Sequence, residues 1–228
     1  MTNLSRKIKN PSIILASKCR ENKILSRTIK QTIKKKFKSQ DNLKVSVIVT
    51  AKMGYRNKPR SVLFSDAVKF CEKNKFSKHF NNIAFEYIDC SSQENLKKFK
   101  ASIKKNKIIL VLGGDTFYLQ YHLHKSKMDK LIKKRVYKDN VLYVGCCAGS
   151  IVAGKTMYPA HYTRQNEKSK KYYKRNFYKK KYFSKSDNNN SLKLVNKNIY
   201  PHCTKNKKTF RVKNKTFHCL REYTPFTK

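Results

Sequence analysis

The chain has 228 residues, of which 39% are hydrophobic, so it is long enough for one domain with its own core and too apolar for a disordered chain. Its 55 Lys and Arg residues against 13 Asp and Glu residues give a formal charge of +42, which taken alone favours a polyanionic partner. No stretch approaches the roughly 20 apolar residues of a membrane span, so no membrane association is predicted.

The distribution of the basic residues weakens the argument for a polyanion. Lysines occupy nearly every polar stretch, and the chain is also rich in Asn, Ile, Tyr and Phe. This pattern is typical of a composition bias across the whole chain more than of a built patch. Nucleic-acid binding therefore remains an alternative that the composition permits and does not favour.

The cysteines and the basic N-terminus bear on the compartment. The seven cysteines show no metal-binding spacing, so free thiols in a reducing cytoplasm are expected, with no metal and no cofactor. The apolar part of the N-terminus, "SIILA", is too short for the core of a signal peptide. The sequence indicates no particular oligomeric state.

Strands and helices alternate from residue 11 to residue 155. Short apolar runs predict strands at 11–17, 43–50, 83–89, 107–115 and 140–146. Helical patterns lie between and after them, at 20–38, 61–80, 91–105, 116–137 and 148–154. Ser91 and Glu94 have the spacing of a capping box at the start of the third helix. This alternation predicts a parallel sheet covered by helices on both faces, with a ligand site at the carboxyl ends of the strands.

The pattern breaks after the last of these helices. Residues 164–190 are rich in Lys, Tyr and Asn, which predicts a disordered low-complexity insertion within a single domain spanning 1–228. Its interleaved Lys and Tyr residues would suit single-stranded nucleic acid, but a solvated loop is the favoured interpretation. Regular structure resumes with a strand in 192–203 that runs into a turn at Pro201, and residues 209–228 give one or two further strands.

A possible nucleophile lies where the fifth strand meets its helix. Gly145-Cys146-Cys147-Ala148-Gly149 has the G-x-[SC]-x-G form of a nucleophile elbow, a sharp turn that exposes its central side chain. That centre is Cys147, and the helix N-terminus is expected to favour its thiolate. Cys146 is expected to be buried and inert. The alternative is a tight strand-to-helix connection without chemistry.

A second glycine-rich turn strengthens the chemical interpretation. Gly113 and Gly114 follow the preceding strand, which should neighbour the elbow in the sheet. Acyl transfer needs two backbone N–H groups directed at the oxyanion, and Gly114 and Ala148 could supply one each.

The two motifs together resemble a known family. "LGGDTFYLQYHL" followed by "LYVGCCAGSIVAG" is similar to the aspartyl dipeptidase (peptidase E) and cyanophycinase family of serine peptidases. The resemblance covers about two-thirds of the chain. It implies an α/β three-layer sandwich with a mostly parallel sheet, like the class I glutamine amidotransferases (flavodoxin-like). It also implies a nucleophile at Cys147, oxyanion donors at Gly114 and Ala148, a general base at His202 in "YPHC", and N-terminal aspartyl dipeptides as substrates.

The chain departs from the family pattern at three points. Cysteine replaces the nucleophilic serine, the basic insertion separates the elbow from His202, and the C-terminal part of the family fold is expected to be shortened. Glu222 is the only acidic residue after His202 and hence the candidate for an otherwise unknown third member of the triad. Arg211 is a candidate for binding an acidic substrate group. His79, His122, His124, His161 and His218 compete with His202 for the role of base.

Three functions remain in competition. The leading one is a hydrolase of small peptides that uses a cysteine nucleophile. An inactive family member that serves as a binding protein is the second. A basic nucleic-acid-associated protein built on this fold is the third.

Overall fold

A computed structural model describes residues 11–19, 22–37, 43–55, 58–73, 78, 80, 83–161, 191–203, 208–212, 215–220 and 225–228. The insertion predicted at 164–190 lies outside these residues, as do Glu222 and His79.

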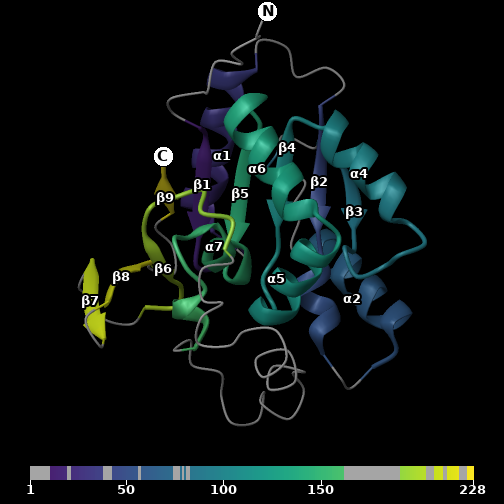
Figure 1. Cartoon of the computed structure of the whole chain (residues 1–228). Helices are drawn as coiled ribbons and strands as arrows, with labels where there is room; N and C mark the ends of the chain where they lie inside the picture. The colour runs from purple at the N-terminus through teal and green to yellow at the C-terminus, as the bar shows by residue number, and fades with distance from the viewer. Residues whose placement is uncertain are drawn as a thin grey trace, which may run out of the picture.

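The core is a six-stranded sheet of order β3-β2-β4-β5-β1-β9 (Figure 1). Its parallel strands are β1 (Ile13–Ala16), β2 (Lys44–Ile48), β3 (Ala84–Ile88), β4 (Ile108–Val111) and β5 (Leu142–Cys146). The short strand β9 (Phe226–Thr227) pairs antiparallel with β1 at the edge. The central strands β1, β4 and β5 are buried throughout, as expected for a parallel sheet covered on both faces.

Helices cover this sheet on both faces (Figure 1). They are α1 (Lys23–Lys36), α2 (Arg60–Lys73), α4 (Leu96–Lys105), α5 (Thr116–Lys125), α6 (Met128–Lys138) and α7 (Ala148–Ala153), with 3-10 turns η1 (Thr50–Gly54) and η2 (Tyr158–His161). Right-handed crossovers and this strand order put α1 and α2 on one face and α4 to α6 on the other. The predicted α/β fold class is confirmed.

Two of the expected helix boundaries are wrong. The helix predicted from Ser91 begins only at Leu96, because the hydroxyl and N–H of Ser91 donate to Asp89 and fold this segment into a turn. The single helix predicted over 116–137 is divided into α5 and α6. Lys127, at the division, has a left-handed backbone with φ 59°.

A second, three-stranded sheet follows α7. Its strands are β6 (Asn198–Tyr200), β7 (Thr209–Val212) and β8 (Lys215–Cys219), in the order β6-β8-β7. The strand predicted in 192–203 is therefore much shorter than expected. Residues 194 and 195 instead donate their N–H groups to the carbonyl of Ala153 and hold this segment against α7.

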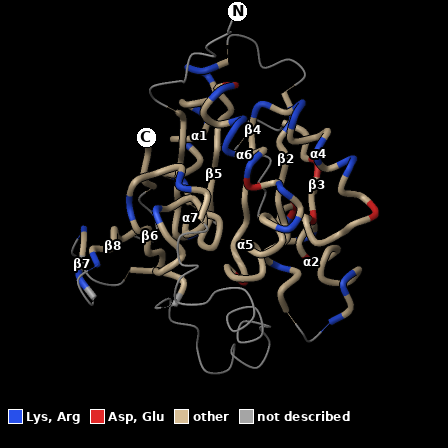
Figure 2. The backbone as a smooth tube through the Cα atoms, in the orientation of Figure 1, with Lys and Arg blue, Asp and Glu red and all other residues tan. Residues whose placement is uncertain are grey.

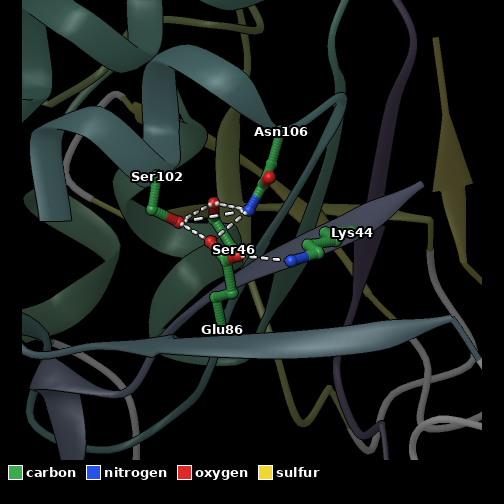
Figure 3. Close-up of polar contacts among 5 residues, drawn as sticks. All are labelled: Lys44, Ser46, Glu86, Ser102 and Asn106. Atoms are coloured by element: carbon green, nitrogen blue, oxygen red, sulfur yellow. Dashed lines mark hydrogen bonds and ion pairs between the residues drawn. The ribbon is translucent and has the colours of Figure 1, made fainter. Parts of the chain in front are cut away.

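A polar cluster joins α4 to β2 and to the edge strand β3 (Figure 3). The carboxylate of Glu86 accepts hydrogen bonds from Ser102 (2.6 Å) and Asn106 (2.9 Å), and Lys44 lies 3.4 Å away. Ser46 from β2 completes the cluster by accepting from Asn106. The pKa of Glu86 is lowered, first by the hydrogen bond from Ser102.

Basic residues are spread over most of the helices and also lie on β2, β7 and β8, whereas acidic residues are few (Figure 2). None of the helices in the described part of the chain combines the length and the apolarity that a membrane crossing needs.

Candidate active site

Three neighbouring strands, β4, β5 and β1, end at the same edge of the main sheet. The residues that follow them are Gly113 and Gly114 after β4, Cys147 after β5 and Ser17 after β1. Because parallel strands direct their carboxyl ends to one side, loops far apart in sequence meet there. This edge contains the candidate site.

Cys147 forms a sharp turn between β5 and α7. Its backbone has φ 49° and ψ −104°, a conformation that typically costs a non-glycine residue about 1–3 kcal/mol. The N–H of Cys147 donates to the carbonyl of Ala16 at 2.9 Å, and the carbonyl of Cys147 accepts from Ser150 and Ile151 at 3.0 Å. These bonds hold the strained turn in place.

Small residues allow this turn to pack against the neighbouring strand. A Cβ added at Gly149 would lie 2.2 Å from the carbonyl oxygen of Val111, so a side chain there would push α7 away from β4. The strand-to-helix geometry that the G-x-C-x-G pattern predicts is therefore present.

His202 lies against the thiol of Cys147, with its Nε2 3.2 Å from Sγ. It follows Pro201, just after β6, and has φ 57°, so both members of this pair have a positive φ. Strained residues of this kind cluster at functional sites, where the surrounding structure must hold them. The structure thus brings together two residues that are 55 positions apart.

Ser17 is the residue that sequence reasoning missed. Its hydroxyl oxygen accepts from the backbone N–H of His202 at 2.7 Å and lies 3.2 Å from Nδ1 of the ring. The side chain is buried, with 1% of its surface exposed. Its place directly after a buried strand, at the ligand-binding edge of the sheet, could have suggested a role for Ser17. Only the fold shows that His202 lies beside Ser17.

Burial raises the pKa of the Cys147 thiol above its ordinary value. The charge of Lys52 and the backbone N–H groups of Ala148 and Gly114, which interact with the sulfur, act in the opposite direction and are smaller. Burial therefore opposes the thiolate that was expected at the helix N-terminus. The two predicted oxyanion donors, Gly114 and Ala148, nonetheless lie at the sulfur.

Gly114 occupies a position that a side chain could not share. Its φ is 143°, and an added Cβ would lie 2.4 Å from the carbonyl oxygen of Ala51 in η1. Its neighbour Asp115 donates its N–H to the same carbonyl at 2.8 Å and caps α5 with its carboxylate. The loop is therefore fixed from both sides, and so is the direction of the Gly114 N–H.

A pocket of about 250 Å³ lies beside η1. Its lining includes Leu63, Ala67 and Phe70 from α2, together with Lys52, Tyr55, Lys58 and Asp66. Lys58 is paired with Asp66 at 2.7 Å, whereas Lys52 has no acidic partner among the described residues. Lys52 therefore connects this pocket with the thiol on which its charge acts.

The other residues proposed from the sequence are not described in contact with Cys147 or His202. Arg211 is exposed on β7, the edge strand of the small sheet, and no described contact joins it to Cys147 or His202. Glu222 is outside the described residues. His124 pairs with Asp129 at 3.0 Å, and the ring of His122 packs against the rings of Tyr118 and Tyr121.

Four of the seven cysteines are paired, which corrects the expectation of free thiols. Cys19 is bonded to Cys146, and Cys203 to Cys219, while Cys71, Cys90 and Cys147 are free. Cys146 is therefore not an unused strand residue. No group of side chains suited to hold a metal ion occurs within the described ranges.

Comparisons with known proteins place the chain in one family of peptidases. A family model described as Peptidase family S51 matches residues 35–226. An uncharacterized peptidase of Listeria innocua, Lin0382, is 37% identical over 59 residues, and one of Listeria monocytogenes, Lmo0363, is 28% identical over 94 residues. These matches cover 26% and 41% of this chain, and the chain spans only 28% and 45% of the length of those relatives.

Solved structures show the same fold. A Listeria monocytogenes protein assigned to peptidase E superposes with a TM-score of 0.63 at 17% identity, covering 96% of this chain and 94% of the other. A peptidase from an acI-B1 actinobacterium superposes with a TM-score of 0.58 at 16% identity, covering 87% and 70%.

Proposed function

Since the chain belongs to peptidase family S51, we propose that it hydrolyses small peptides by acyl transfer through Cys147. The observation that carries this proposal is the 3.2 Å contact between Cys147 Sγ and His202 Nε2, a nucleophile and a base within hydrogen-bonding reach. That both residues have a positive φ, supported by surrounding hydrogen bonds, adds to it.

The reaction begins from a protonated thiol, because burial raises the pKa of Cys147. As Sγ attacks the scissile carbonyl carbon, its proton passes to Nε2 of His202. The carbonyl oxygen gains negative charge and accepts hydrogen bonds from the N–H groups of Gly114 and Ala148. His202 then protonates the leaving amine as the C–N bond breaks. The thioester that remains is hydrolysed when water gives a proton to His202 and attacks the acyl carbon.

Ser17 takes the place that an acidic residue holds in a serine-type triad. For His202 to act as a base, its proton must be on Nδ1, and Ser17 Oγ can accept it while also accepting from the backbone N–H. A hydroxyl fixes the ring orientation in this way but supplies no negative charge to stabilise the imidazolium. We therefore assign Ser17 a positioning role.

Aspartyl dipeptides are the proposed substrates, and Lys52 replaces Arg211 as the residue that binds their acidic group. Lys52 lies close enough to Cys147 for its charge to act on the thiol, and it lines the pocket at η1. The apolar floor formed by Leu63, Ala67 and Phe70 would accept the hydrocarbon part of a substrate residue.

Nucleic-acid binding remains the alternative, supported only by the charge of +42. A cytoplasmic location stays a prediction, but the cysteine argument for it no longer applies, since two disulfides are more typical of oxidising compartments.

The test is hydrolysis of a panel of Asp-Xaa dipeptides by the wild type, Cys147→Ala, His202→Ala and Cys71→Ala. Turnover should disappear in Cys147→Ala and fall about 10²–10⁴-fold in His202→Ala. Cys71→Ala is the matched control, because Cys71 is a free, buried thiol on α2 with no described contact to Cys147 or His202. Turnover that survives in Cys147→Ala would remove Cys147 as the nucleophile.

A further inference from the structure

The pocket beside η1 is joined to the proposed active site through the loop after β4. A Cβ added at Gly113 would lie 2.9 Å from the Cβ of Cys147, and one added at Gly114 would lie 2.9 Å from the backbone nitrogen of Lys52. This loop therefore packs against the nucleophile on one side and against Lys52 on the other. Since Lys52 also lines the pocket, a group bound there lies next to the loop that would hold the oxyanion.

One face of α2 forms another wall of this pocket. The lining residues that α2 contributes are three or four positions apart, which places them on a single helical face: Leu63, Asp66, Ala67 and Phe70. Leu63 and Ala67 are buried, whereas Asp66 is exposed. Of the described residues that line the pocket, Asp66 alone is acidic, in a chain that has 13 acidic residues against 55 basic ones.

The carboxylate of Asp66 has an oxygen that is open to a ligand. Its Oδ2 accepts from Nζ of Lys58 at 2.7 Å, while Oδ1 has no hydrogen bond within the described part of the chain. The side chains of Lys58 and Asp66 expose 45% and 46% of their surfaces. An ion pair as exposed as this one is weak, so a second cation can share the carboxylate or replace Lys58.

The ammonium group of Lys52 lies close to Asp66 without pairing with it. Nζ of Lys52 is 4.5 Å from the centre of the Phe70 ring. Phe70 follows Asp66 by four positions, which is about 6 Å along the helix axis. No ion pair joins Lys52 to Asp66 among the described residues. The pocket therefore offers a cation and a carboxylate at separate places, about one helical turn apart.

We propose that Asp66 binds the free α-ammonium group of the substrate while Lys52 binds its acidic side chain. This assignment rests on the proposed function, in which Lys52 receives the carboxylate of an aspartyl residue. An N-terminal aspartyl residue carries its ammonium on Cα and its carboxylate on the neighbouring Cβ, so its two charges are opposite in sign to the two charges of the pocket. An internal aspartyl residue has a neutral amide in place of the ammonium. Asp66 thereby restricts the reaction to the N-terminus of a peptide.

A purely structural role of Asp66 makes a different prediction. If Asp66 served only to hold Lys58, then removal of either partner would have the same effect on ligand binding. If Asp66 binds the substrate ammonium, removal of Lys58 takes away a competing cation and leaves the carboxylate available. Asp66→Asn and Lys58→Gln separate these two roles, because both side chains are half-exposed and neither substitution empties a buried position.

The test compares two ligands that differ only in the ammonium group. They are Asp-Leu and succinyl-leucine, which is Asp-Leu without its α-ammonium. Binding is measured by isothermal titration calorimetry in a Cys147→Ala background, so that hydrolysis does not interfere. The readout is the Kd of succinyl-leucine divided by the Kd of Asp-Leu. The extra negative charge of succinyl-leucine affects this ratio in every variant alike, so only its change between variants is interpreted.

The ratio should fall about 3–10-fold in Asp66→Asn, as expected for the loss of a hydrogen-bonded ion pair that is partly exposed. In Lys58→Gln it should stay the same or rise. Glu72→Gln is the matched control, because it removes the same charge from an exposed position of α2 that does not line the pocket, and its ratio should not change. A ratio that does not fall in Asp66→Asn overturns the proposal, and so does an equal fall in Lys58→Gln or Glu72→Gln.

Hydrolysis of Asp-Leu by the chain with Cys147 intact is followed separately. Turnover together with an unchanged ratio in Asp66→Asn overturns the role of Asp66 and leaves the proposed function standing. A ratio that falls as expected without any turnover supports Asp66 as the ammonium-binding residue and removes the hydrolase. If neither ligand binds, the pocket does not receive an N-terminal aspartyl residue and the proposal is overturned.

Discussion

Substitution of Gly114 by alanine tests the link between the loop after β4 and the proposed chemistry. The added Cβ would lie 2.4 Å and 2.5 Å from the carbonyl oxygen and carbon of Ala51, and φ is 143°. These are backbone atoms, which no rotamer change can move. Backbone strain of about 1–3 kcal/mol and overpacking of about 1–3 kcal/mol give a loss of roughly 2–6 kcal/mol in the free energy of unfolding.

To relieve this clash, the loop after β4 must move away from Ala51, and the Gly114 N–H moves with it. Removal of one oxyanion donor lowers kcat by about 10²–10³-fold. The assay measures kcat on an Asp-Xaa dipeptide at a temperature where the variant is folded, together with urea unfolding. Ile103→Ala is the control: this fully buried residue on α4 gives a comparable loss of about 2–5 kcal/mol away from the loop.

The control should keep the wild-type kcat while its stability falls. A Gly114→Ala variant that melts like the wild type would refute the steric argument. A variant that is destabilised as expected but keeps the wild-type kcat would refute the assignment of the Gly114 N–H as an oxyanion donor.

Three further outcomes follow from the same structure. Ser17→Ala removes both hydroxyl contacts of the base, so kcat should fall about 10-fold or more with KM unchanged, and an unchanged kcat would contradict the positioning role. Burial raises the pKa of Cys71 and of Cys90 to about 12, while the unfolded thiols ionise near about 8.5. Their effect on the free energy of unfolding is therefore fully stabilising below about pH 8.5. Above that pH each thiol lowers the free energy of unfolding by up to roughly 1.4 kcal/mol per pH unit, until the pH reaches about 12. Thermal melting between about pH 8 and 10 should show this loss in the wild type and a smaller one in Cys71→Ala/Cys90→Ala. Hydrogen bonds lower the pKa of Glu86, so its contribution is present above the unfolded pKa of about 4.3 and is lost as pH falls through the folded value. Glu86→Gln should cost about 1 kcal/mol near neutral pH in urea unfolding and almost nothing in acid, because this carboxylate is partly exposed.

The fold was predictable because its parallel strands are short runs of buried apolar residues. Strands of this kind, such as "IILV" and "LYVGC", have no solvent face and stand out from the Lys-rich helices between them. The wrong predictions concern helix boundaries, which depend on local hydrogen bonds and backbone angles. Ser91 bonds back to Asp89 and delays α4, and the left-handed Lys127 divides a continuous helical pattern.

The site was predictable where its residues lie in local motifs, and at His202 through the family resemblance. Cys147 and Ala148 belong to the elbow after β5, and Gly114 belongs to the glycine-rich turn after β4. Because β4 and β5 are neighbours in the sheet, these two turns lie side by side. The contact of Ser17 with His202 joins the end of β1 to the end of β6 across 185 positions, and no local pattern encodes it. The disulfides are equally non-local: sequence separations of 127 and 16 leave many pairings open among seven cysteines.

The surroundings of Cys147 explain how a cysteine can occupy a position where the family has serine. Burial raises the pKa of the thiol, so the proposed site at rest pairs a neutral thiol with a histidine, as a serine site pairs a hydroxyl with one. Proton transfer to His202 must then accompany attack on the carbonyl. The position of His202 becomes decisive, because a thiol that is not already ionised gains its reactivity only from a base within reach. A site of this kind would be silenced by moving the histidine alone, which makes the two contacts of Ser17 with His202 part of the proposed machinery.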